Sequence, residues 1–76
     1  MKVGGGNLRN KLVDYRQKFG YSQEKLAEML EVSRQTIISI EKGKYNPSLP
    51  LAMRMAEIFR TNVESIFILE ENDYKK

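Results

Sequence analysis

Residues 22–44 decide the fold, and they read Ser-Gln-Glu-Lys-Leu-Ala-Glu-Met-Leu-Glu-Val-Ser-Arg-Gln-Thr-Ile-Ile-Ser-Ile-Glu-Lys-Gly-Lys. Ser22 and Ser33 each stand at the position of an N-cap, because a serine hydroxyl accepts a hydrogen bond from an unpaired amide of a first helical turn. Apolar residues recur at helical spacing after each serine, at Leu26, Ala27, Leu30, Ile37 and Ile40. Gly43 favours a helix end after the second run. The stretch therefore predicts two short helices joined by a tight turn.

The second of these helices leaves a different set of side chains outside the predicted core. Ile37 and Ile40 face inward on this pattern. The opposite side and the N-terminal end then carry Arg34, Gln35, Ile38 and Ser39. Arginine bonds guanine through two donors, glutamine does the same for adenine, serine is adaptable, and an aliphatic group packs on the methyl of thymine. We therefore expect these four residues to contact bases in a major groove, with a guanine opposite Arg34 and a thymine near Ile38.

The chain resembles the Cro and phage-repressor family, often called the Xre family, over roughly residues 7–68. The matching motifs occur in the family's order and spacing: Ser22-Gln23, Leu26-Ala27, Val32-Ser33-Arg34-Gln35-Thr36-Ile37, Ile40-Glu41-Lys42-Gly43-Lys44 and Asn46-Pro47-Ser48. The resemblance implies an all-α, lambda-repressor-like domain of five short helices, with the second helix of the pair as the recognition helix. It also implies sequence-specific binding to double-stranded DNA for transcriptional regulation, most simply repression by occupying a promoter.

The resemblance implies roles for residues around this helix pair. We expect contacts to DNA phosphates from Gln23, Thr36, Lys42, Lys44 and Asn46, and the roles of Gln23, Lys44 and Asn46 follow from the family. An ordinary solvated glutamine is the alternative for Gln23. The family also implies an ion pair between Arg16 and Glu41 that holds the first helix against the recognition helix, with a phosphate contact open to Arg16. Tyr45 stays open between the sugar-phosphate backbone and the edge of the core.

Composition limits the chemistry of the chain. Its 76 residues make one small domain, and they include no Cys and no His. This removes disulfides, thiolate chemistry, imidazole acid-base catalysis and the usual zinc ligands. We therefore expect no enzymatic activity, no metal site and no cofactor. No separate sensing domain and no small-molecule effector are evident from the sequence.

Charge is unevenly placed along the sequence. Residues 1–60 carry 11 basic and 6 acidic side chains, a net charge of +5, whereas residues 61–76 carry 2 and 4, a net charge of −2. This asymmetry fits a nucleic-acid face with a tail turned away from phosphate, and a mixed, soluble surface is the alternative. The chain has no apolar run of about 18 residues and no signal peptide. We therefore expect a cytoplasmic protein that does not enter a membrane.

Flanking helices are predicted from caps and apolar spacing. Asn7 caps a first helix that presents Leu8, Leu12, Tyr15 and Phe19 and ends at Gly20. Ser48 caps a fourth helix whose inner stripe is Leu49, Ala52, Met55, Ala56 and Phe59. Arg60 follows where many family members have glycine, which leaves the shape of that helix end open. Asn62 caps a short last helix. Residues 1–6, with three glycines, form a flexible or extended lead-in.

The end of the domain is more apolar than a small monomer requires. Ile66, Phe67, Ile68 and Leu69 form an apolar run, and its last residue begins the charged tail at residues 69–76. We expect this run to form a dimer interface and its last three residues to pair as a strand with the lead-in at Lys2–Gly5. A homodimer would bind a near-palindromic operator with its recognition helices about 34 to 36 Å apart. The alternative is an antitoxin-like interaction module whose main partner is another protein.

Overall fold

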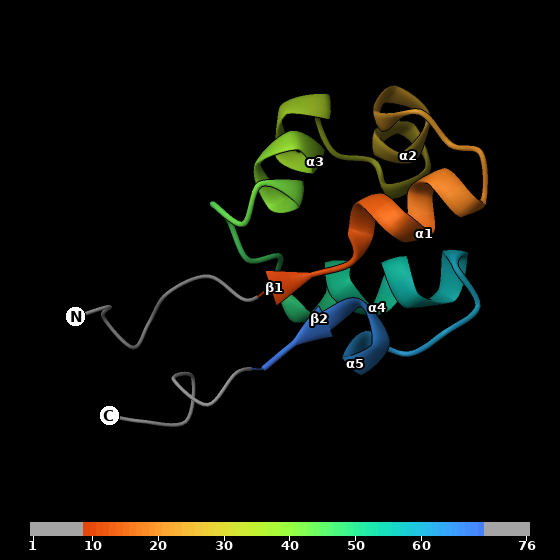
Figure 1. Ribbon diagram of the computed structural model, residues 1–76. Helices are drawn as coiled ribbons and strands as arrows, with labels where there is room; N and C mark the ends of the chain where they lie inside the picture. The colour runs from red at the N-terminus through yellow and green to blue at the C-terminus, as the bar shows by residue number, and fades with distance from the viewer. Residues whose placement is uncertain (1–8, 70–76) are drawn as a thin grey trace.

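A computed structural model describes residues 9–69, and within this range the chain forms five helices and two short strands (Figure 1). The elements follow in the order β1 (Arg9–Asn10), α1 (Leu12–Lys18), α2 (Gln23–Leu30), α3 (Arg34–Glu41), α4 (Leu49–Ile58), α5 (Val63–Ile66) and β2 (Phe67–Ile68). The five-helix fold with a minor two-stranded sheet is confirmed. The lead-in at residues 1–6 and the tail beyond Leu69 lie outside the described residues.

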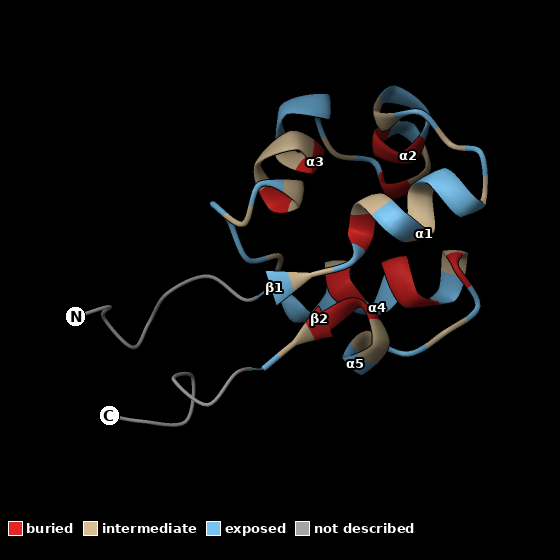
Figure 2. Ribbon diagram, in the orientation of Figure 1, coloured by how far each residue is buried: buried red, intermediate tan, exposed pale blue. Residues whose placement is uncertain are grey.

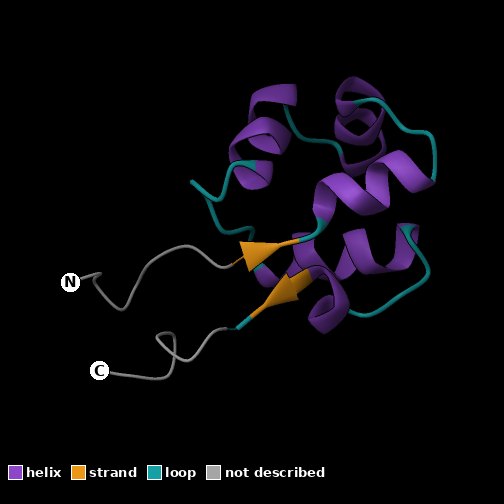
Figure 3. Cartoon of the chain, viewed as in Figure 1, coloured by secondary structure: helices purple, strands orange, loops and turns teal. Residues whose placement is uncertain are grey.

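The helices pack in two groups that meet at one core. α2 contacts α3 and α4, and α1 contacts α3. Figure 3 shows β1 and β2 side by side at one edge, between the group of α1, α2 and α3 and the group of α4 and α5. In Figure 2 the buried segments of the helices face one another across this centre. The buried hydrophobic residues are Leu12, Leu26, Ala27, Leu30, Ile37, Ile40, Ala52, Met55, Ala56, Phe59, Ile66 and Phe67.

Phe59 joins the two groups of helices through aromatic contacts. Its ring centroid lies 5.2 Å from that of Phe19 in an edge-on arrangement and 5.6 Å from that of Tyr15. Tyr21 packs on the same ring at 6.1 Å. Such pairs add to the free energy of burying the rings themselves. The aromatic spacing in the first predicted helix therefore marks its core-facing side.

Four helices begin with the side-chain caps that the sequence predicts. The amides that donate to these caps are those of Lys25 to Ser22 at 2.9 Å, Thr36 to Ser33 at 3.1 Å, Leu51 to Ser48 at 3.3 Å and Ser65 to Asn62 at 2.9 Å. Each cap satisfies one amide that has no partner within its helix. The predicted starts of these four helices are confirmed.

The first helix begins later than the sequence predicts. α1 starts at Leu12, and its preceding residue, Lys11, makes no side-chain cap. Asn7 and Leu8, the predicted cap and first apolar residue, lie outside the described residues. The start is displaced because residues 9–11 bond to the other end of the domain: the Lys11 amide donates to the Ile66 carbonyl at 2.8 Å. A segment held in this way is extended and cannot also be helical.

The two strands pair at a different place from the one predicted. Arg9 lies opposite Ile68, and Asn10 lies opposite Phe67, in antiparallel register. The predicted partner segment, Lys2–Gly5, lies outside the described residues. The apolar run therefore does form a strand, but the described partner of this strand immediately precedes α1.

Leu49 does not belong to the inner stripe of α4, and that part of the prediction is wrong. Its exposed fraction is 67%, whereas Ala52 and Met55 are buried. Side chains on a helix lean toward its N-terminus, so a residue in the first position extends past the end of the core. Leu51, which is half-buried, packs against the core instead.

Each of the first four helices ends at a left-handed residue. These residues are Gly20, Glu31, Gly43 and Arg60, with φ of 76°, 60°, 73° and 56°. After α4 the amide of Thr61 donates to the Ala56 carbonyl at 2.9 Å, and that of Arg60 donates to the Glu57 carbonyl at 3.1 Å. The same pattern of bonds closes α3, where the Gly43 amide donates to the Ile40 carbonyl and the Lys44 amide to the Ser39 carbonyl. Arg60 therefore makes a left-handed turn that favours glycine, but with a side chain that disfavours it.

We expect Arg60→Gly to raise the free energy of unfolding by about 0.5–1 kcal/mol, because glycine adopts positive φ without steric cost. Urea denaturation followed by circular dichroism measures the change. The matched control is Arg54→Gly, which removes the same charge from an exposed position within α4. It should lower the free energy of unfolding by about 1 kcal/mol. Destabilisation by both substitutions would contradict the argument.

Candidate nucleic-acid interface

The four predicted base-reading residues share the exposed side of α3. Arg34 and Gln35 are exposed in its first turn, and Ile38 and Ser39 are half-buried in the next. The Gln35 Nε2 donates to the Ser39 hydroxyl at 3.4 Å, which places these two side chains on one face. Ile37 and Ile40, on the opposite face, are fully buried. The core therefore fixes which side of α3 is presented to solvent.

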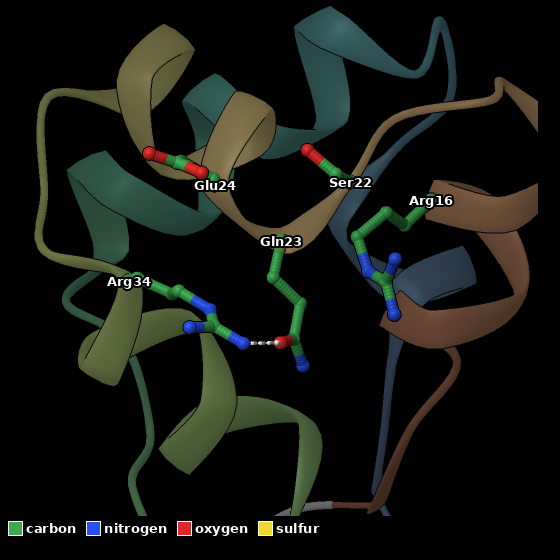
Figure 4. A pocket seen from close by; sticks show the side chains of 5 residues that line it. All are labelled: Arg16, Ser22, Gln23, Glu24 and Arg34. Carbon is green, nitrogen blue, oxygen red and sulfur yellow. Dashed lines mark hydrogen bonds between the residues drawn. The ribbon is translucent and has the colours of Figure 1, made fainter.

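A first hollow, of about 550 Å³, lies where the N-terminal ends of α2 and α3 meet (Figure 4). Its lining residues are Arg16, Ser22, Gln23, Glu24 and Arg34. Figure 4 shows Gln23 between the guanidinium groups of Arg16 and Arg34. Arg34 and the amide-rich start of α2 favour an anion such as a DNA phosphate, whereas Glu24 adds an opposing charge and the charge of Arg16 is paired with Glu41.

Arg16, which lines this hollow, forms an ion pair with Glu41. The Arg16 Nε donates to Glu41 Oε2 at 2.6 Å, and Nη2 donates to Oε1 at 3.4 Å. The third guanidinium nitrogen, Nη1, donates to the Tyr21 carbonyl at 3.1 Å. The two side chains are only 14% and 6% exposed. α1, the turn after it and the last residue of α3 are therefore held by one largely buried guanidinium group.

Gln23 connects this ion pair to Arg34 at the N-terminal end of α3. Its Nε2 donates to Glu41 Oε1 at 3.0 Å, and its Oε1 accepts from Arg34 Nη2 at 3.4 Å. The side-chain amide thus bridges an acid at one end of α3 and a base-reading candidate at the other. A phosphate bound by Gln23 would share the donor that now bonds Glu41.

A second hollow, of about 260 Å³, lies along α3 and the turn that follows it. It is lined by Ser33, Gln35, Thr36, Ser39, Lys44 and Tyr45. Two predicted phosphate contacts, Thr36 and Lys44, meet here with two predicted base readers. Lys42 and Asn46, the remaining phosphate candidates, are exposed but line neither of these two hollows.

Ser33 was not among the predicted contacts and Tyr45 was left open between DNA and the core edge, yet both line this second hollow. The Ser33 hydroxyl caps α3 and bonds the Thr36 hydroxyl at 3.0 Å. Tyr45 follows Lys44 in the turn after α3 and is 48% exposed. Adjacency to Lys44 was the available sequence signal for Tyr45. For Ser33, the sequence indicated only its role as the N-cap of α3 and gave no sign that it would also line this hollow.

The predicted dimer surface is narrower than the apolar run suggested. Ile66 is fully buried and Phe67 is 7% exposed, so both side chains belong to the core of their own chain. Ile66 has no exposed surface to offer a partner and Phe67 has very little, so the predicted dimer contact rests mainly on the last two residues of the run. Ile68 is half-buried and Leu69 is 54% exposed, so these two residues remain available.

Two further findings apply to the described residues 9–69. No group of three or more acidic, histidine or cysteine side chains there could hold a metal ion. None of the helices in that range is long and apolar enough to cross a membrane.

A family model described as "Helix-turn-helix" matches residues 12–66, which includes α1 through α5. The chain belongs to this family. Its resemblance to the Cro and phage-repressor type is confirmed, and helix-turn-helix proteins of this type are transcriptional regulators that bind DNA. The family is not one of enzymes.

Relatives and solved structures agree with this assignment. The chain is 53% identical over 66 residues to the uncharacterized HTH-type transcriptional regulator MJ0272 of Methanocaldococcus jannaschii, covering 87% of this chain and 100% of the relative. It is 48% identical over 66 residues to YgzD of Bacillus subtilis, with the same coverage. The crystal structure of the restriction-modification controller protein C.AhdI from Aeromonas hydrophila is similar at TM-score 0.65 and 28% identity, over 71% of this chain and 82% of that one.

We expect Arg16→Met to lower the free energy of unfolding by about 2 kcal/mol, between the values for exposed and buried ion pairs, because it leaves the Glu41 carboxylate largely buried without its partner. Adding Glu41→Leu should restore roughly half of that loss. Urea denaturation measures both. Lys18→Met, on the exposed side of α1, serves as the control and should change stability by less than about 0.5 kcal/mol. A double variant less stable than the single one would contradict this role for the pair.

Proposed function

We propose that this helix-turn-helix regulator is a cytoplasmic repressor that binds a near-palindromic operator as a homodimer. The observation that carries the proposal is the composition of α3's outer face. Arg34, Gln35 and Ser39 lie on it together, while Ile37 and Ile40 hold its other face in the core. A short helix with donors on its free side suits a major groove.

Base reading starts at Arg34. It is the first residue of α3, and its guanidinium is held at one side by the Gln23 carbonyl oxygen. The remaining donors can bond guanine O6 and N7 together. Gln35 and Ser39 follow one turn apart on the same face, and Ile38 offers an aliphatic surface for a thymine methyl. We therefore assign base contacts to all four.

Phosphate contacts flank this reading face on both sides. Gln23 lies at the first hollow, and Thr36 and Lys44 lie at the second. Lys42 and Asn46 are exposed in the turn after α3, close in sequence to Lys44. Phosphate contacts set the register of a protein on DNA without reading sequence. These five residues would hold α3 in the groove while Arg34 and its neighbours discriminate between bases.

The dimer is proposed to form through Ile68 and Leu69 at the end of the domain. Leu69 is 54% exposed directly after β2, and Ile68 is only partly covered by its own chain. Burying such a leucine against a second copy favours association. A two-fold axis would then set the two recognition helices about one turn of DNA apart, as operator half-sites require. The antitoxin-like module is the weaker alternative, because the relatives described above are named transcriptional regulators.

Selection from a randomised DNA library at two salt concentrations tests base reading. The wild type should enrich an inverted repeat. Arg34→Ala should lose about 1–3 kcal/mol of discrimination at one base pair in each half-site, because the guanine loses a bidentate partner. Lys44→Ala should weaken binding to all sequences alike and reduce the salt slope by about 1 for each subunit.

Lys18→Ala provides the matched control, since Lys18 is exposed on α1 and lines a separate hollow with Asp14 and Tyr15. It should leave both discrimination and salt slope unchanged. Equal loss of affinity by Arg34→Ala for every operator variant would remove Arg34 from base reading. Salt-sensitive binding by the wild type with no enriched sequence would overturn the operator-specific function and favour a protein partner.

We expect Leu69→Lys to weaken self-association at least about tenfold in sedimentation equilibrium, because it places a charge where an apolar surface is buried. The control is Leu49→Lys, which makes the same change at a leucine that is 67% exposed on α4. That variant should remain a dimer. A dimeric Leu69→Lys beside a monomeric Leu49→Lys would transfer the interface to α4.

A further inference from the structure

Asn10 connects three elements that are distant in sequence. Its Nδ2 donates to the Ile40 carbonyl in the last turn of α3 at 2.8 Å, across 30 residues. Its Oδ1 accepts from the Leu12 amide at the start of α1 at 3.0 Å. Its backbone lies opposite Phe67 in the sheet. The two partners fix the orientation of the amide, because an amide needs an acceptor and a carbonyl needs a donor.

The bond to Ile40 acts on a backbone carbonyl at the C-terminal end of α3, next to Glu41, whose side chain is paired with Arg16. The last carbonyls of a helix have no N–H donor within the helix itself. The Ile40 carbonyl also accepts from the Gly43 amide at 2.9 Å, and the Ser39 carbonyl accepts from Lys44 at the same distance. These bonds close the helix end locally. The bond from Asn10 is the one of the three that holds this end to another element.

This end controls the orientation of the reading face. α3 has only eight residues, and Arg34 precedes Ile40 by six positions, or about 9 Å along the axis. Base reading requires side chains held within about 0.5 Å of their working positions. A small tilt at the C-terminal end of so short a helix is therefore transmitted to Arg34. The sheet that holds Asn10 is in turn fixed by the Lys11–Ile66 bond.

We propose that Asn10 is a positioning residue for DNA reading, whose side-chain amide holds the C-terminal end of the recognition helix to the two-stranded sheet. Its effect on DNA rests on the function proposed above. Its effect on the helix end does not depend on any DNA partner. Asparagine suits this role because it carries both a donor and an acceptor, whereas aspartate would offer only acceptors and the serine hydroxyl lies one bond nearer the backbone than the asparagine amide nitrogen.

Asn10→Ser tests the proposal, because serine keeps an acceptor for the Leu12 amide and loses the donor to Ile40. The matched control is Asn62→Ser. Asn62 also accepts from a helix amide, but both of its observed bonds go to Ser65 within the next turn. Amide hydrogen exchange on the full chain is measured at Gly43 and Lys44, together with the affinity ratio of the library-selected site over a site with one altered half.

Loss of the Ile40 bond should speed exchange at Gly43 and Lys44 about threefold to tenfold in Asn10→Ser relative to the rest of α3. The affinity ratio should fall by a similar factor, and Asn62→Ser should change neither. Uniform acceleration across all helices, or faster exchange with an unchanged affinity ratio, would overturn the positioning role.

Two further arms keep the outcomes distinct. Should Asn10→Ser fail to fold, Asn10→Asp retains the acceptor for α1 and opposes the Ile40 carbonyl, with Asn62→Asp as the charge-matched control. Exchange no faster in Asn10→Asp than in that control would overturn the proposal. Should the wild type enrich no sequence, the operator-specific function fails, and the exchange at Gly43 and Lys44 alone decides whether Asn10 holds the helix end.

Discussion

The contact between Arg16 and Glu41 is the interaction on which the position of α3 depends. It joins α1 to the last residue of α3 through a 2.6 Å charge-assisted bond, with both side chains largely buried. Burial makes each charge dependent on the other, because an unpaired buried charge is strongly unfavourable. Glu41 also accepts from the Gln23 Nε2, and the Gln23 Oε1 accepts from Arg34. One carboxylate thus bonds α1 and also the glutamine that accepts from the exposed Arg34.

α3 is held mainly by its buried face and by contacts at its C-terminal end. Ile37 and Ile40 are buried on that face. The Glu41 carboxylate accepts from Arg16 in α1, and the Ile40 carbonyl accepts from Asn10 in the sheet. The N-terminal end carries the exposed Arg34 and Gln35. A domain of this size buries only about 60% of its unfolded surface, so apolar contacts alone are few. The polar contacts of Glu41 and of the Ile40 carbonyl therefore help to fix the orientation of α3 in the domain.

Local features of the domain were predictable because they depend on neighbours in sequence. Each of Ser22, Ser33, Ser48 and Asn62 caps a helix through an amide three residues away. The start of α1 and the exposure of Leu49 were mispredicted because both depend on distant contacts or on where the core ends. Burial of Ile66 and Phe67 in their own chain was missed for the same reason. An apolar run in sequence does not say which apolar surface will cover it.

The sequence by itself determined the helix pair, its caps and membership of the helix-turn-helix family, because these follow from helical periodicity and ordered motifs. The same periodicity determined the outward set of Arg34, Gln35, Ile38 and Ser39. Only the tertiary structure decided that Gln23 bridges Glu41 to Arg34, that Ser33 and Tyr45 join Lys44 around one hollow, and that Asn10 bonds α3. These contacts join residues from separate elements, and their distances are set when the helices pack around Phe59 and the buried isoleucines. Spacing along the chain carries no record of them.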